Sequence, residues 1–273
     1  MPDRRTPAGL RAVLSTALRQ FGHGLISSHQ DYRAMFTWRS WAGGWLVRLL
    51  CQVLFFATLG TLLGSAQATG EIAFGNAAAL GPLAALGVVS STVGERRSGT
   101  LEFLLVTRAD PFLVLASRGL HWVLDGMLTS SVALAVVPLL LPVPLQLTAL
   151  PAVLAVNLLV SLGSYCLALT LAGIALRHPE CRMYLTAGTT IGYLLLCGIT
   201  TPVPQDGLPA RLAAVLPITH GLALMRDLAA GAPFSYGPLL AEAAVALLWG
   251  VAAHLTLGRA LRRAVRTGTL VLH

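Results

Sequence analysis

Few residues of this chain have side chains suited to catalysis, and they are set in long apolar stretches. The sequence contains no GxSxG, HExxH, CxxC or GxxxxGK[ST] pattern, so it lacks the residue spacings of the hydrolase nucleophile elbow, the zinc protease and the nucleotide-binding phosphate loop. His178 and Cys181 flank Glu180 with the spacing of a metal-binding pair. A lone pair of this kind beside an apolar segment is most often incidental. We therefore expect no catalytic residue, cofactor or metal in this chain.

Two acidic residues, Asp125 and Glu242, lie within apolar segments. A carboxylate near the centre of a bilayer costs roughly 2.5 to 3.5 kcal/mol, and less near the end of a segment, where both of these lie. We expect Asp125 to pair with Arg118, two helical turns earlier, and Glu242 to face Arg226. Structural anchoring is the favoured interpretation of both carboxylates, and contact with a substrate path is the alternative.

Uncharged polar residues and cysteines are also scattered through the apolar segments. Asn76, Asn157 and His254 are expected to form hydrogen bonds between helices, with ligand contact as the alternative. The four cysteines have no metal-binding spacing, and we interpret them as small apolar residues of the interior: Cys51, Cys166, Cys181 and Cys197.

The composition places these residues in a membrane. Hydrophobic residues make up 55% of the chain and charged residues 11%, whereas a soluble domain has about 25% charged residues. Apolar stretches long enough to cross a bilayer recur about every 25 to 30 residues. We predict an all-α fold in which one transmembrane domain, residues 1–273, comprises a terminal segment 1–45, a six-span region 46–258 and a tail 259–273. The expected spans are 46–66, 72–94, 120–142, 150–176, 185–202 and 236–258.

The distribution of arginine predicts the orientation of the spans. All nineteen basic residues are arginine, and with these spans only Arg211 and Arg226 fall on one side while the other seventeen fall on the opposite side. Cytoplasmic loops carry the excess of positive charge, so both termini are expected in the cytoplasm of a cell inner (plasma) membrane. In this setting the net charge of +8 indicates attraction to anionic membrane lipids and not to nucleic acid.

The segment before the first span has the pattern of an interfacial elbow helix. Trp38, Trp41 and Trp45 have the spacing of one helix face at the depth of the lipid headgroups. A disordered basic tail is the alternative. Apolar residues with a helical period precede the tryptophans: Leu10, Val13, Leu14, Ala17, Leu18 and Phe21.

Residues 203–235 form the one long connection on the outer side. Prolines and glycines divide it, so that 210–216 and 220–229 can each make only two or three helical turns. We expect short helices that lie on the outer leaflet or enter it partway as re-entrant segments.

A polar insert, residues 95–118, separates the second and third spans. It combines residues of opposite charge with Leu101, Phe103, Leu104, Leu105 and Val106, which predicts a short cytoplasmic helix with an apolar side and a charged side. Such a helix can press apolar side chains into a groove of a partner while Glu95 and Glu102 set the register, together with Arg96. A solvated loop is the alternative.

The run from Glu95 to Leu115, ERRSGTLEFLLVTRADPFLVL, resembles the E-x-x-x-G-T-L-E-x-L-L-x-T-P stretch of ABC-2 type transporter permeases, which include drug and antibiotic exporters. Leu216-Pro217 and the residues up to Arg226 are similar to a segment that precedes the last span in that family. One departure is Arg108-Ala109-Asp110, which displaces the proline that usually follows the threonine.

The resemblance implies a transport subunit with no enzyme activity of its own. Its insert would act as a coupling helix that docks on a separate ATPase subunit, present in two copies and carrying ATP and Mg, and a second identical or different permease would complete a dimer. The substrate would be an antibiotic or another amphipathic small molecule, with polysaccharide, lipid and peptide as alternatives. The implied ATPase contacts are Glu95, Arg96, Gly99, Thr100, Leu101, Glu102 and Leu105.

Two other classes remain open from the sequence. An integral membrane enzyme that modifies lipids would require paired histidines or carboxylates near one membrane face, where this sequence has scattered ones. A non-catalytic assembly or immunity factor would have the same number of spans. Association with an ATPase would distinguish the transport subunit from both.

Overall fold

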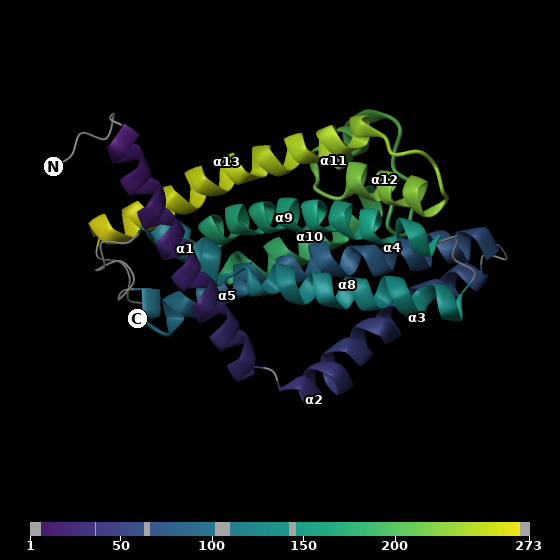
Figure 1. Ribbon diagram of the computed structural model, residues 1–273, viewed down its shortest axis with the longest axis horizontal. Coiled ribbons are helices and arrows are strands. Elements are labelled where there is room, and N and C mark those ends of the chain that lie inside the picture. Colours follow the sequence, from purple (N-terminus) through teal and green to yellow (C-terminus); the bar gives the residue numbers. More distant parts are fainter. Residues whose placement is uncertain (1–6, 36, 63–65, 102–109, 142–145, 268–273) are drawn as a thin grey trace.

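The computed structural model describes residues 7–35, 37–62, 66–101, 110–141 and 146–267, and every regular element in these ranges is a helix. The helices are arranged as a bundle whose long axis is horizontal in Figure 1. In chain order they are α1 (Pro7–Met35), α2 (Trp38–Ser40), η1 (Trp41–Leu46), α3 (Val47–Leu62), α4 (Ala66–Ala85), α5 (Gly87–Arg97), α7 (Pro111–Arg118), α8 (His121–Leu140), η2 (Leu147–Ala149), α9 (Leu150–Ala175), η3 (Pro179–Cys181), α10 (Arg182–Leu196), α11 (Gly207–Val215), α12 (Thr219–Ala229) and α13 (Tyr236–Thr267).

Four helical segments are long and apolar enough to cross a membrane: Gln67–Arg97, Pro111–Leu140, Leu150–Ala175 and Tyr236–Ala264. The first two are formed by α4 with α5 and by α7 with α8. The pair α11 and α12 would make a fifth span if it were counted as one, although it is bent by 79°. The expectation of an all-helical protein with several helices able to span a membrane is therefore confirmed for the part of the chain that the structure describes.

Two of the six predicted spans correspond to helices that are too short to cross a membrane by their own length. α3 has 16 residues and α10 has 15, against roughly 20 for a span. α10 ends at Leu196 because Gly198 has a φ of 81° and because Thr200 Oγ1 donates to the Leu194 carbonyl oxygen at 2.6 Å. The apolar pattern of 185–202 therefore includes a bent segment that is not helical.

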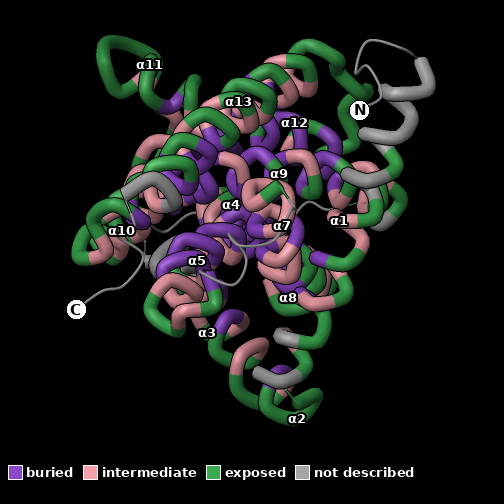
Figure 2. The backbone as a smooth tube through the Cα atoms, turned by 90° about the vertical axis from the view of Figure 1, so that its left-hand side faces the viewer, coloured by how far each residue is buried: buried purple, intermediate pink, exposed green. Residues whose placement is uncertain are grey.

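α4 and α9 form the centre of the bundle. Figure 2 shows most of their residues as buried, whereas most residues of α10, α11 and α13 are exposed or intermediate. α8 packs along α4, and α13 packs along α9. Small residues line the interior of α4, including Ala73, Ala77 and Ala78, and they allow helix backbones to approach closely.

The two ends of the bundle differ in the elements that meet there (Figure 1). At one end, Arg96 of α5 donates to the Leu176 carbonyl oxygen after α9, and Phe112 of α7 contacts His254 of α13. At the opposite end, Arg226 of α12 donates to the carbonyl oxygens of Gly198 at 2.6 Å and Glu71 at 3.3 Å. We call these the α5 end and the α12 end.

The N-terminal segment is one helix of 29 residues, longer than the expected interfacial helix. α1 crosses the α5 end of the bundle obliquely, and α2 and η1 connect it to α3 (Figure 1). The three tryptophans lie next to one another, because the exposed Trp38 stacks on the buried Trp41, and Trp41 and Trp45 both donate to Asp125. Their place at headgroup depth stays a prediction. η1 is a π-helix, a conformation found mostly in short stretches and frequently at functional sites.

Candidate functional site

A sharp turn ends α5 within the predicted coupling segment. Gly99 has a φ of 74°, and the backbone N–H groups of Ser98 and Gly99 donate to the carbonyl oxygens of Gly94 and Arg96. Thr100 Oγ1 donates to the Glu95 carbonyl oxygen at 3.1 Å, and the chain resumes helical geometry with Leu101, which is 2% exposed. We call residues 95–101 the coupling turn.

The coupling turn is tied to two other helical segments of the bundle. Glu95 Oε2 lies 3.3 Å from Arg118 Nη1 of α7, and both side chains are partly buried. Arg96 Nη1 donates to the Leu176 carbonyl oxygen at the end of α9. Thr100 is exposed. The turn therefore offers an accessible surface while its charged side chains hold it to α7 and α9; the predicted contacts Glu102 and Leu105 lie outside the described residues.

Gly99 allows a prediction about the coupling turn that separates backbone strain from packing. No atom lies within 4 Å of a Cβ built on Gly99 or on Gly94, so Gly99→Ala is expected to destabilise the protein by about 1 kcal/mol through its positive φ alone. Gly94→Ala, inside α5, is expected to stabilise it by roughly 0.5 to 1 kcal/mol. Unfolding in detergent micelles measures both changes. Gly99→Asn should be milder than Gly99→Ala, and effects of equal sign for the two alanine variants would contradict the assignment.

The displaced proline of the insert begins α7. Asp110 is the N-cap, and its carboxylate accepts from the backbone N–H of Phe112 at 2.9 Å. Pro111 occupies the first helical position, where its missing N–H costs no hydrogen bond. The residues Arg108-Ala109-Asp110 therefore move the helix start to Pro111.

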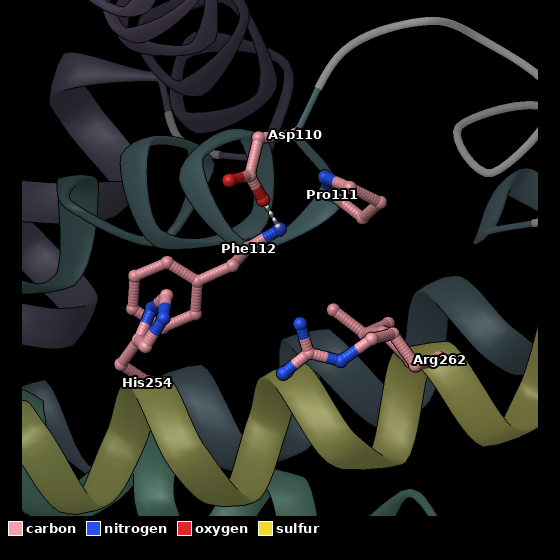
Figure 3. A pocket seen from close by; sticks show the side chains of 7 residues that line it. Asp110, Pro111, Phe112, His254 and Arg262 are labelled. Atoms are coloured by element: carbon pink, nitrogen blue, oxygen red, sulfur yellow. Dashed lines mark hydrogen bonds between the residues drawn. The ribbon is translucent and has the colours of Figure 1, made fainter. Parts of the chain in front are cut away.

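α7 begins against the last turns of α13. The Phe112 ring meets the His254 ring edge to face at a centroid distance of 4.9 Å, and Arg262 lies beyond them on α13 (Figure 3). These residues line a small cavity of about 130 Å³ with Asp110 and Pro111. His254 thus contacts an aromatic ring of another helix, where we had expected a helix-to-helix hydrogen bond.

Asp125 accepts hydrogen bonds from three aromatic side chains. Tyr32 Oη donates to Oδ1 at 2.5 Å, Trp41 Nε1 donates to Oδ1 at 2.6 Å and Trp45 Nε1 donates to Oδ2 at 3.0 Å. The carboxylate is 4% exposed. The expected pair with Arg118 is not the one formed, because Arg118 is directed to Glu95 and the aromatic donors from α1 and η1 reach Asp125.

The phenol of Tyr32 lies outside the apolar helices. Its burial raises its pKa well above the ordinary value of 10.0, and the hydrogen bond to Asp125 raises the pKa further. Asp125 raises the pKa of the phenol because removal of the phenol proton would place a second negative charge beside the carboxylate. Tyr32 therefore stays a donor to Asp125 over the physiological pH range.

The contact of Tyr32 with Asp125 is the last of a series between α1 and the α7–α8 segment. Gln20 Oε1 accepts from the Asp110 backbone N–H, and Ser28 Oγ accepts from the His121 backbone N–H at 3.1 Å. A Cβ on Gly24 would overlap the side chain of Ser117, so the two backbones approach closely there. The α1 residues of this series recur every four positions: Gln20, Gly24, Ser28 and Tyr32.

This series, which we call the α1 zipper, was not predicted from the sequence. The signal was present as a second, polar stripe on the N-terminal helix and as the i, i+4, i+8 spacing of Ser117, His121 and Asp125. No pattern within either stripe indicates that the two helices meet.

Glu242 stabilises the first turn of α12. Its Oε1 accepts from the backbone N–H of Ile218 at 2.9 Å, and its Oε2 accepts from that of Gly221 at 2.8 Å. The carboxylate is fully buried and supplies acceptors to the unpaired N–H groups that begin every helix. The expected partner Arg226 lies at the other end of α12 and donates to carbonyl oxygens of Glu71 and Gly198.

Ile218 precedes α12 with a φ of 110°, which a β-branched residue rarely adopts. It is fully buried, and its N–H is held by Glu242. Such strain persists only where the surrounding structure compensates for it, and Glu242 provides two of the compensating hydrogen bonds.

Asn157 connects three helices. Its Nδ2 donates to Ser130 Oγ of α8 at 2.7 Å, and that hydroxyl donates in turn to the Ala77 carbonyl oxygen of α4 at 2.8 Å. Asn76 instead donates to the Ile72 carbonyl oxygen of its own helix. The buried amide of Asn157 therefore contributes to packing in the centre of the bundle.

The cysteines are all free, but Cys51 and Cys181 are exposed, so the expectation of four interior cysteines is wrong for these two. His178, Glu180 and Cys181 are also exposed. Within the described ranges no group of three or more His, Cys, Asp or Glu side chains is placed to hold a metal ion.

Comparisons with protein-family models, with curated proteins and with solved structures found no match for this chain. The fold by itself defines an all-helical protein with four or five helices able to cross a membrane, counted over the part of the chain that the structure describes.

Proposed function

We propose that this chain is the membrane-spanning permease subunit of an ABC-2 type exporter, driven by ATP hydrolysis on separate ATPase subunits. The observation that carries the proposal is the coupling turn. Its sequence resembles the family's coupling segment, it follows directly on a helix able to cross a membrane, and Thr100 at its tip is exposed. The charged residues at its base are engaged with α7 and α9.

Six crossings are part of this proposal, although two of the helices are short. α10 begins near the α5 end, after α9, and stops next to Gly198, which meets Arg226 at the α12 end. α3 leads from Trp45, which contacts Asp125, towards the start of α4, where Glu71 meets Arg226. In this proposal each of the two is a crossing, because each runs towards the α12 end of the bundle (Figure 1). α11 and α12 then form the short pair on the outer side.

With these crossings, the α5 end faces the cytoplasm. The arginines that close α5 and α9 lie there, as do those of the last turns of α13: Arg96, Arg97, Arg177, Arg259, Arg262 and Arg263. Positive charge concentrates on the cytoplasmic side of membrane proteins. Both chain ends would then be cytoplasmic, and α1 would lie along the inner leaflet of the plasma membrane.

A docked ATPase would act on the bundle through the ties of the coupling turn. A displacement of the turn pulls on α7 through Glu95 and Arg118 and on α9 through Arg96. α7 also contacts α1 through the α1 zipper, so a movement of α7 would move the N-terminal helix as well. Ion pairs and packed helices with two discrete arrangements are the means by which such a movement spreads. Two ATPase subunits, a second permease and an amphipathic small molecule as substrate complete the proposal.

Co-purification tests the docking role of the coupling segment. The full chain is co-expressed in turn with each ABC ATPase subunit of its own genome, and we expect one of them to be retained. Glu102→Arg should reduce its retention by about tenfold, because a reversed charge in an ion pair across an interface costs more than 1.4 kcal/mol. Glu180→Arg is the matched control, since Glu180 is an exposed glutamate of η3 at the same end of the bundle.

The Glu180→Arg control should retain the ATPase. In the wild type and in both variants, substrate-stimulated ATP hydrolysis should rise and fall with the amount of ATPase retained. If the wild-type chain retains no ATPase, or if Glu102→Arg retains as much as the control, the permease assignment is wrong. A lipid-modifying activity of the chain alone would favour the enzyme alternative.

A further inference from the structure

A cavity of about 580 Å³ lies where α5 meets the α7–α8 segment. Glu95 and Arg118, which form the ion pair between the two segments, both line it. One wall comes from α5 and the coupling turn, and the other contains His121 and Trp122. The volume falls in the range of roughly 300 to 1,000 Å³ that is typical of pockets for small molecules.

The cavity has an aromatic floor. A Cβ on Gly87 would overlap the ring of Trp122, so the indole lies directly on the backbone of α5, and its Nε1 is directed to Ser91 Oγ at 3.3 Å. Val88 and Leu115 extend this apolar surface. A ring held in this way favours an occupant with a flat apolar group, because stacking and burial act together.

The rim of the cavity is polar without a net charge. The hydroxyls of Ser98 and Thr100 lie within hydrogen-bond distance of the Glu95 carbonyl oxygen and 3.1 Å from each other, and a hydroxyl oxygen has two lone pairs with which it can accept. Glu95 and Arg118 both line the cavity and neutralise each other in their ion pair, with Nη1 and Oε2 3.3 Å apart. An anion would meet the Glu95 carboxylate and a cation would meet the Arg118 guanidinium, whereas an uncharged or zwitterionic polar group meets neither penalty.

We propose that this cavity binds an uncharged or zwitterionic amphipathic small molecule, with its apolar ring on Trp122 and its polar end at the hydroxyls of the coupling turn. The occupant touches both walls, so it braces the joint between α5 and α7. The consequence of that bracing for transport rests on the proposed function, whereas binding itself does not.

Photolabelling tests the proposal with two probes of similar size and different charge. The full chain in phosphatidylcholine nanodiscs is irradiated with benzophenone, which is neutral, or with 4-benzoylbenzoate, which is anionic, and labelled peptides are identified by mass spectrometry. We expect saturable benzophenone labelling of peptides that contain Ser91 or Trp122. Labelling of the same peptides by 4-benzoylbenzoate should be weaker by about fivefold or more.

A filled cavity provides the decisive comparison. Ser91→Trp should reduce benzophenone labelling of the cavity peptides by about fivefold or more. Ser90→Trp, at the exposed rim, should do the same and covers the case in which Ser91→Trp does not fold. Ala187→Trp, on the exposed face of α10, is the control and should leave the labelling unchanged. Unchanged labelling in the Ser90 and Ser91 variants, or stronger labelling by the anionic probe, overturns the proposal.

A competitor identifies the source of the occupant. If dihexanoylphosphatidylcholine displaces benzophenone, the occupant is a zwitterionic lipid. If it does not, the occupant is another amphipathic molecule. Both results support an uncharged or zwitterionic amphipathic occupant. The labelling needs no ATPase, so it can succeed although no ATPase co-purifies. Conversely, retention of an ATPase without cavity labelling overturns this inference alone.

Discussion

Replacing Glu242 with leucine is expected to lower the free energy of unfolding by about 3 kcal/mol, because two buried backbone N–H groups would lose their acceptors. The carboxylate is fully buried and supplies both hydrogen bonds to the start of α12. Leucine has a similar size, so the loss of the acceptors and not the loss of volume would cause the change. Ile218 would also lose one of the hydrogen bonds that compensate for its positive φ.

Thermal unfolding in detergent micelles measures this change, and hydrogen exchange of residues 219–225 locates it. Glu242→Gln should be intermediate, since an amide keeps one acceptor oxygen but turns its NH₂ group towards the other N–H. Asp227→Asn, at an exposed residue of α12, should change the stability by less than about 0.5 kcal/mol. A Glu242→Leu variant as stable as Asp227→Asn would show that Glu242 does not stabilise α12.

Asp125→Ala is expected to destabilise the protein by about 3 kcal/mol, because three hydrogen bonds to one buried side chain are lost at once and each contributes about 1 kcal/mol. Tyr32, Trp41 and Trp45 would lose their common acceptor. The effect should be concentrated in the last turn of α1 and in η1. Backbone amides of residues 38–46 should therefore exchange their hydrogens faster by about tenfold or more.

Asp206→Ala serves as the matched control for Asp125. Asp206 is exposed and makes no side-chain capping hydrogen bond at the start of α11, so its replacement should be nearly neutral. Tyr32→Phe should reproduce about one third of the Asp125→Ala effect, because it removes one donor of three. Faster exchange spread evenly over the whole chain would argue against Asp125 as the anchor of α1 and η1.

The sequence predicted the positions of the helices better than the contacts between them. The apolar stretches within 72–94, 120–142, 150–176 and 236–258 correspond to helices that can cross a membrane. The stretch 185–202 contains a helix that ends early, at Leu196, and continues as a non-helical segment. In the stretch 46–66 the described residues are helical up to Leu62. Hydropathy measures apolar content and not backbone hydrogen bonding, so it cannot distinguish the last turns of a helix from an apolar bend.

The predicted partners of the buried carboxylates were wrong for a related reason. Asp125 and Glu242 were paired with the nearest available arginines in the sequence, yet Asp125 meets aromatic donors from α1 and η1, and Glu242 meets backbone N–H groups at the start of α12. Burial does require that a carboxylate find hydrogen-bond donors, and that expectation holds for both. The identity of the donors depends on which helices become neighbours.

The sequence by itself determined the composition-dependent properties of this protein: helices throughout the described residues, several of them apolar enough for a membrane, and a charged turn between the second and third apolar segments. These follow from local periodicity and from the cost of exposing apolar surface or burying charge. Only the tertiary structure decided that Gln20, Gly24, Ser28 and Tyr32 lie along α7 and α8, and that a cavity opens beside the coupling turn. Residues about 90 positions apart meet there, and periodicity specifies the face of each helix but not the helix that faces it.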